Sequence, residues 1–139
     1  MTKNNYKKAV KALVSFSGKY LILLKSAKEE VSPLEWDIPG GRMKTGETEK
    51  EALLREIKEE TGIDISFSKI LLIKNWQMDK NGVKIDGKDF LCILDKPQEV
   101  ELSEEHTDAR WLTKKEIDAS REIPSWIQET VGKASHLDF

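Results

Sequence analysis

The sequence has very little cysteine and no long apolar segment. Cys92 is the single cysteine among 139 residues, so an internal disulfide is excluded and a reducing compartment is expected. Because it lies within the apolar run FLCIL, this thiol is interpreted as a small buried residue. No stretch approaches the roughly 18 apolar residues of a membrane span, and the first residues lack the apolar segment of a signal peptide. We therefore expect a cytoplasmic protein that does not enter a membrane.

An excess of positive charge is also missing, because the formal net charge is −2. Proteins that bind long nucleic acids draw much of their affinity from basic residues that face the phosphate backbone, so this class of partner is not expected. Hydrophobic residues make up 38% of the chain, which argues against disorder. The length suits a single domain over residues 1–139 with one hydrophobic core.

Short apolar runs separated by turn-forming residues predict a set of β-strands. The first two strands, over 7–16 and 19–25, are separated by Ser17-Gly18, a composition typical of a hairpin. Later strands are expected at 65–78, 89–95 and 110–112, with a polar loop over 26–35, a short segment at 36–38 and a turn-rich segment over 79–88.

The longest predicted helix spans about residues 48–61. Thr48 and Glu51 have the spacing of a capping box, in which each side chain bonds to the other residue's backbone N–H. Gly62 stands where a left-handed C-terminal cap is needed.

Two shorter helices are expected near the end of the chain. Thr113 and Glu116 repeat the capping-box spacing, and Pro124 fits the first turn of a last helix over about 124–131. Strands interspersed with helices in this way predict an α/β fold in which helices cover a mixed sheet.

The helix over 48–61 concentrates carboxylates on one face. At about 100° per residue, Glu56, Glu59 and Glu60 fall within a sector about 100° wide. The apolar stripe beside them consists of Leu53, Leu54 and Ile57. The helix is therefore expected to bury one face and to present three glutamates on the next.

This carboxylate face has two interpretations. The ordinary one is a solvated charged surface stabilised by pairs four residues apart. However, Glu56 and Glu60 are like charges at that spacing, and at about 4 Å with an effective dielectric near 20 they repel by roughly 4 kcal/mol before relaxation. A divalent cation would reverse this penalty, and carboxylate oxygens are ligands that Mg²⁺ and Mn²⁺ prefer. The pattern thus favours a metal site.

The residues from Gly41 to Ile63 also follow a known pattern. Gly41, five residues, Glu47, seven residues and then REIKEETGI fill every fixed position of G-x5-E-x7-R-E-U-x-E-E-x-G-U, where U is a bulky aliphatic residue. This pattern is the signature of the Nudix hydrolases, and a match at every specified position makes the resemblance strong. WDIPGG before it and EEHTDARWL after it resemble the usual flanks, so the resemblance extends over most of residues 6–118.

The resemblance implies an α/β/α sandwich that hydrolyses nucleoside diphosphates linked to another group, with Mg²⁺ or Mn²⁺ as cofactor. It implies that the metal ligands are Glu56, Glu59 and Glu60, together with the backbone carbonyl of Gly41. Glu56 or a glutamate from a later loop is the candidate catalytic base. Arg55 would orient the carboxylates through charge-assisted bonds, and Glu47 would act from the edge of the site, through water or by bracing the loop.

A further metal ligand is expected outside the signature. In similar enzymes a glutamate reaches the metal from a loop before a late tryptophan, and Glu105, six residues before Trp111, is the candidate, with Glu104 as its substitute. His106 is interpreted either as a plain loop histidine or as a residue that contacts a phosphate or transfers a proton.

Substrate-binding residues are less well specified. Arg42 and Lys44 precede the glutamate helix and are candidates for contacting phosphates, with solvated loop cations as the alternative. Trp36 and Trp76 are candidates for stacking on a base, with core or rim packing as the alternative.

Residues downstream of the signature help to predict which substrate is cleaved. Similar enzymes that cleave ADP-ribose often have a proline about 16 residues after it, and those that cleave dinucleoside polyphosphates have a tyrosine there, whereas this chain has Met78-Asp79-Lys80. We therefore expect a nucleoside triphosphate as substrate, as in MutT-type enzymes. The alternatives are an ADP-sugar or other nucleotide conjugate and, more distantly, a noncatalytic binding module. Homodimers are common among such enzymes, but no apolar stripe here marks an interface.

Overall fold

The computed structural model describes residues 6–30, 32–65 and 69–137 of the chain. The strands and helices are β1 (Tyr6–Phe16), β2 (Lys19–Lys25), β3 (Trp36–Asp37), β4 (Gly40–Arg42), α1 (Glu49–Thr61), β5 (Ile70–Lys80), β6 (Val83–Ile93), β7 (His106–Thr113), α2 (Lys114–Ala119) and α3 (Ser125–Ala134). None of these helices has the length and apolar character needed to cross a membrane.

The strands of the described residues form one mixed sheet around β1. The main order is β3-β2-β1-β6-β5, with β4 joined to β1 and β7 joined to β2. β1 and β6 run parallel along most of their length, whereas the other pairs are antiparallel. β4 pairs with the middle of β1, at residues 9–11, and α1 packs on both of these strands. The loop that leads into α1 is therefore anchored at the centre of the sheet.

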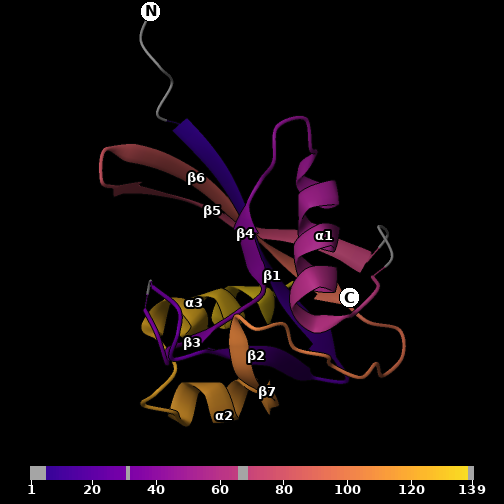
Figure 1. Cartoon of the computed structure of the whole chain (residues 1–139). Helices are drawn as coiled ribbons and strands as arrows, with labels where there is room; N and C mark the ends of the chain where they lie inside the picture. The colour runs from indigo at the N-terminus through magenta and orange to yellow at the C-terminus, as the bar shows by residue number, and fades with distance from the viewer. Residues whose placement is uncertain (1–5, 31, 66–68, 138–139) are drawn as a thin grey trace, which may run out of the picture.

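Side chains alternate across β1 and β2, so the sheet has two apolar faces. The cluster under α1 includes Val10, Val14, Leu21, Leu53 and Ile57. The cluster under α2 and α3 includes Leu13, Ile22, Ile117, Ile127 and Val131. Figure 1 shows α1 on one side of the sheet and α2 and α3 on the other. The predicted α/β/α sandwich with a mixed sheet is confirmed.

The local signals for the long helix are also confirmed. Thr48 accepts a hydrogen bond from the backbone N–H of Glu51, whose side chain accepts one from the backbone N–H of Thr48. Gly62 closes the helix with φ 74°. The buried stripe of the helix differs from the prediction at one residue. Leu54 is only half-buried, and Ala52 is fully buried instead.

Several strand and helix boundaries differ from the prediction. The strand predicted at 65–78 is β5 at Ile70–Lys80, and the strand predicted to end at 95 ends at Ile93. The segment 79–88 contains one tight turn, at Asn81-Gly82, and β6 begins directly after it because residues 83–88 pair with β5 on one side and with β1 on the other. β7 begins at His106, four residues before the predicted strand, because it pairs with β2 from there on. α3 continues to Ala134, beyond the predicted end at 131. Residues 66–68 of the predicted strand 65–78 lie outside the described residues.

Candidate metal-binding active site

The three glutamates of the predicted carboxylate face lie at different depths. α1 buries Leu53 and Ile57 against the sheet, and this packing fixes the rotation of the helix. Glu60 is the deepest of the three, with 3% of its surface exposed. The side chains of Glu56 and Glu59 are 14% and 55% exposed. The face therefore runs from a buried carboxylate to one open to solvent.

Glu60 is a carboxylate held in an environment that disfavours its charge. Burial, followed by the nearby carboxylate of Glu56, raises the pKa of Glu60 to about 9. One stabilising contact opposes this, since Oε2 of Glu60 accepts a 3.0 Å hydrogen bond from the backbone N–H of Gly40. A positive charge placed beside Glu60 and Glu56 would relieve both the burial cost and the repulsion.

Arg55 links the carboxylates of the signature to one another. Its Nε and Nη2 donate hydrogen bonds of 2.6 and 2.9 Å to Glu47, and its Nη1 donates one of 2.8 Å to Oε1 of Glu56. A longer contact of 3.4 Å reaches Glu59. The hydrogen bonds from Arg55 and from the backbone N–H of Lys44 hold the pKa of Glu47 at about 2. Glu47 thus braces Arg55 and the loop before α1, and Arg55 fixes where the Glu56 carboxylate lies.

Gly41 leaves room for the Glu56 carboxylate. A Cβ atom added to Gly41 would lie 2.7 Å from Oε1 of Glu56, closer than real Cβ contacts allow. Neighbouring Gly40 is also confined, because a Cβ there would lie within 2.3 Å of the Val10 carbonyl. The close approach between Gly41 and Glu56 was not predicted, because it depends on a contact between the loop and the helix that residue spacing does not reveal.

Glu105, in the loop before β7, also lies close to Glu60. Its backbone carbonyl accepts a 2.9 Å hydrogen bond from Ser26, which ties the loop before β7 to the end of β2. A ligand atom each from Glu60, Glu105 and His106 lies within 4.8 Å of the others. Burial, and then the charges of nearby glutamates, raise the pKa of Glu105. The structure thus brings Glu105 to Glu60, while Glu104 is an exposed neighbour outside this group.

His106 differs from the expected plain loop histidine. It is the first residue of β7, pairs with Lys25 and is 6% exposed. Its Nδ1 lies 3.8 Å from Oε1 of Glu60. Burial lowers the pKa of His106.

The side chains of Arg42 and Lys44 are exposed. Their backbones belong to the network described above, because the Arg42 carbonyl accepts a 3.3 Å hydrogen bond from Arg55 and the Lys44 N–H bonds to Glu47. The structure therefore shows a bracing role for these backbones.

A cavity of about 430 Å³ lies on the α3 side of the sheet, next to this site. Its apolar wall is formed by Trp36, Trp76, Met78 and Trp126, and its rim includes Lys11, Lys25, Lys74 and Lys80. None of Glu56, Glu59, Glu60 and Glu105 lines this cavity, but two residues that do, Lys25 and Asp37, act by their charge on the site: Lys25 on Glu105 and His106, and Asp37 on His106. Trp126 was not predicted, because its approach to the strands depends on the placement of α3.

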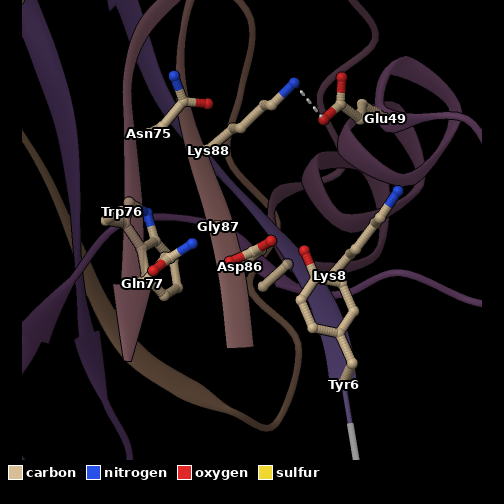
Figure 2. Close-up of a pocket in the computed structure, with 10 residues that line it drawn as sticks. Tyr6, Lys8, Glu49, Asn75, Trp76, Gln77, Asp86, Gly87 and Lys88 are labelled. Atoms are coloured by element: carbon tan, nitrogen blue, oxygen red, sulfur yellow. Dashed lines mark ion pairs between the residues drawn. The ribbon is translucent and has the colours of Figure 1, made fainter. Parts of the chain in front are cut away.

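Trp76 is held at the boundary between two cavities. Its Nε1 donates a 2.8 Å hydrogen bond to the buried carboxylate of Asp89, which also accepts one of 2.9 Å from Thr130. The indole covers Gly87, where an added Cβ would lie 2.0 Å from the ring. The second cavity, of about 370 Å³, lies beyond this ring and includes Lys88, which reaches Glu49 of α1 (Figure 2). Both tryptophans singled out in the sequence, Trp36 and Trp76, thus line the larger cavity.

The residues present fit a divalent cation. Glu56 and Glu60 are neighbouring carboxylates, Glu60 is nearly buried, and Glu105 adds oxygen donors from a separate strand connection. Hard oxygen donors of this kind suit Mg²⁺ and Mn²⁺. Without a cation, the like charges would repel one another at this short range. The geometry therefore supports a metal-binding function for this cluster.

Comparison with known proteins places this site in a family. Residues 5–131 match the family described as NUDIX domain. The nucleoside triphosphatase NudI of Enterobacter sp. (strain 638) is 32% identical over 117 residues, which cover 76% of this chain and 80% of that protein.

Two solved structures show the same fold. The MutT protein from Methanosarcina mazei Go1 has a TM-score of 0.80 at 24% identity, covering 97% of this chain and 96% of that one. An Ap4A hydrolase from C. elegans has a TM-score of 0.72 at 24% identity, covering 93% and 95%. Since the NUDIX match spans nearly the whole chain and includes the glutamate helix, this protein is an enzyme of the Nudix hydrolase family.

Proposed function

We propose that this enzyme hydrolyses a nucleoside triphosphate to a nucleoside monophosphate and pyrophosphate, with Mg²⁺ or Mn²⁺ as cofactor. The observation that carries the proposal is that Glu105 lies close to Glu60, which has Glu56 as its neighbour. A cavity with an aromatic wall and a lysine rim supports it. A diphosphate carries the charge that a metal site and lysines would neutralise, and a nucleoside carries the flat ring that tryptophans bind.

The roles of the residues follow from their positions. Glu56, Glu59, Glu60 and Glu105 would hold the cation, and the Gly41 carbonyl would complete the set at the loop. Arg55 and Glu47 would keep the Glu56 carboxylate in place through the bonds described above. Arg42 and Lys44 would meet the phosphates from the exposed loop.

The reaction breaks one P–O bond by the attack of water on phosphorus. A bound divalent cation would neutralise phosphoryl charge and lower the pKa of a coordinated water. Glu56 or Glu105 would accept the water's proton. Glu105 suits this role because it lies close to Glu60 and because its exposed side chain is not tied up by Arg55.

The choice of a triphosphate rests on two observations. The proline and tyrosine markers described above are absent from Met78-Asp79-Lys80, and one relative that matches 76% of this chain is named a nucleoside triphosphatase. An ADP-sugar or other nucleotide conjugate is the alternative. A panel of nucleoside triphosphates, ADP-ribose and dinucleoside polyphosphates, assayed with Mg²⁺ and with Mn²⁺, decides between them. Activity confined to ADP-ribose would overturn the triphosphate proposal.

The metal assignment is tested by removing single carboxylate charges. Glu59→Gln and Glu60→Gln should each reduce metal-dependent turnover by at least about 100-fold while the protein stays folded. Full turnover in both variants would refute the assignment.

Glu105 has a matched control in its neighbour. Glu105→Gln should lower kcat strongly, whereas Glu104→Gln, which changes an exposed glutamate one residue away, should leave it unchanged. Equal losses in the two variants would show that the loop, and not the Glu105 carboxylate, matters.

A further inference from the structure

The Nδ1 atom of His106 is a buried polar atom that has no partner in the described part of the chain. The side chain is 4% exposed, and no hydrogen-bond donor or acceptor of the described residues reaches Nδ1. Buried polar atoms are nearly always satisfied, so an orphan of this kind calls for a partner that the described residues do not supply, either an ordered water or a bound ion. The carboxylate of Glu60, 3.8 Å away, is too distant for a hydrogen bond.

The ring is held in this position by the backbone. His106 begins β7 and pairs with Lys25 of β2, and the preceding residue accepts a hydrogen bond from Ser26. The imidazole therefore stays beside Glu60 and Glu105 without reaching bulk solvent. Imidazole is a common metal ligand through either of its ring nitrogens.

The distances suit two donors of one cation. Metal bonds to imidazole nitrogen and to carboxylate oxygen are about 2.1 Å long, so two donors of the same ion lie at most about 4.2 Å apart. Nδ1 of His106 and Oε1 of Glu60 lie within this limit. The ligand atoms of Glu60, Glu105 and His106 lie up to 4.8 Å apart, so Glu105 must move slightly closer to bind the same ion. Its exposed side chain can make this movement.

We propose that Nδ1 of His106 is a direct ligand of the cation held by Glu60 and Glu105. The site is then a mixed nitrogen and oxygen site, whereas the ligands implied by the signature are all oxygen atoms. Imidazole nitrogen favours transition metals over Mg²⁺, so the site prefers Mn²⁺ to Mg²⁺. This inference rests on the proposed metal-dependent function, because it assigns one more donor to the same cation.

The test is pulsed electron paramagnetic resonance of the full chain loaded with Mn²⁺ alone, without nucleotide. A nitrogen bound directly to Mn²⁺ gives a strong ¹⁴N coupling, and labelling the histidines with ¹⁵N must change that signal. The chain contains two histidines, so His136→Gln is a matched control that removes the other, exposed one. We expect the nitrogen signal in the unmodified protein and in His136→Gln.

Two substitutions of His106 test the loss of the Nδ1 nitrogen, one with another donor atom in its place and one without. His106→Asn places an amide oxygen near the position of Nδ1, and His106→Gln leaves that position empty. Both should lose the nitrogen signal, and His106→Gln should weaken Mn²⁺ binding by about 10-fold or more while Mg²⁺ binding changes less. The ¹⁵N measurement on His136→Gln, whose one remaining histidine is His106, decides the question even if neither His106 variant folds.

The outcomes are distinct. Bound Mn²⁺ without a histidine nitrogen signal would overturn this inference and leave the proposed hydrolysis intact. A histidine signal that persists in His106→Gln would also overturn it. A histidine signal that depends on His106, in a protein that cleaves no nucleoside triphosphate, would support the ligand and refute the proposed substrate.

Discussion

Replacing Gly41 with alanine tests whether the enzyme depends on the position of the Glu56 carboxylate. The new Cβ atom would lie 2.7 Å from Oε1, 2.9 Å from Cδ and 3.0 Å from Oε2 of Glu56. Ordinary van der Waals contact begins at 3.4 Å, so the carboxylate must retreat by about 0.7 Å, the difference between 3.4 and 2.7 Å. Such a retreat also strains the 2.8 Å bond from Arg55.

The expected loss falls on catalysis rather than on folding. A misplacement near 1 Å can cost about 100-fold in rate, so we expect kcat/KM to fall by roughly 10- to 100-fold. Gly41 does not have the left-handed backbone conformation that only glycine adopts easily, and Glu56 is a flexible side chain. The free energy of unfolding should therefore change by no more than about 1 kcal/mol.

The assay combines pyrophosphate release with unfolding in urea. Alanine keeps the Gly41 carbonyl, so a loss of activity with unchanged stability identifies the missing space, not the missing carbonyl, as the cause. Unchanged kcat/KM would refute the reasoning, because Glu56 would then not need the position seen in the structure. A loss of several kcal/mol in stability would refute it as well, since the glycine would then serve the fold.

Three further predictions concern stability and reactivity. Gly132→Ala, in α3 with open space around an added Cβ, should stabilise the protein by about 0.5 to 1 kcal/mol in urea unfolding, and destabilisation would show that the helix is not as described. Burial raises the pKa of the Cys92 thiol, so a thiol reagent at pH 8 should label it only as fast as the protein unfolds, and rapid labelling of folded protein would contradict its burial. The pKa of Asp37 lies below its ordinary value, because Lys11 and Lys25 outweigh the effect of burial. The stabilisation by the Asp37 carboxylate should therefore be complete above its ordinary pKa of 3.8 and be lost as the pH falls through the lower pKa of the folded state. Asp37→Asn should lower the free energy of unfolding by about 1 to 3 kcal/mol at pH 7. The stability of this variant should also depend less on acid pH than that of the unmodified protein.

The parts of the fold that local sequence determines were predicted well. The capping box at Thr48 and the glycine cap at Gly62 act within a few residues, and the angular spacing of Glu56, Glu59 and Glu60 follows from helix geometry alone. For this reason the boundaries of α1 and the shared face of its glutamates could be read from the sequence.

The parts that depend on distant contacts were missed. Gly87 carries a turn-like composition, but it lies inside β6 because that strand is paired on both sides and Trp76 covers the glycine. His106 resembles a loop residue in the sequence, yet pairing with Lys25 draws it into a strand and buries it. The choice between Glu104 and Glu105 likewise required knowing which of them lies against Glu60.

The position of the aromatic cavity has a consequence for how the enzyme can change over evolutionary time. Its walls come from β1, β2, β3, β5, β6 and α3, and no residue of α1, all of which is described, lines it. Asp89 and Thr130 hold Trp76 in place without touching the glutamates. Substitutions at Trp76, Met78 or Trp126 can therefore reshape the cavity without changing the contacts of the α1 carboxylates, so the two parts of the molecule can change independently.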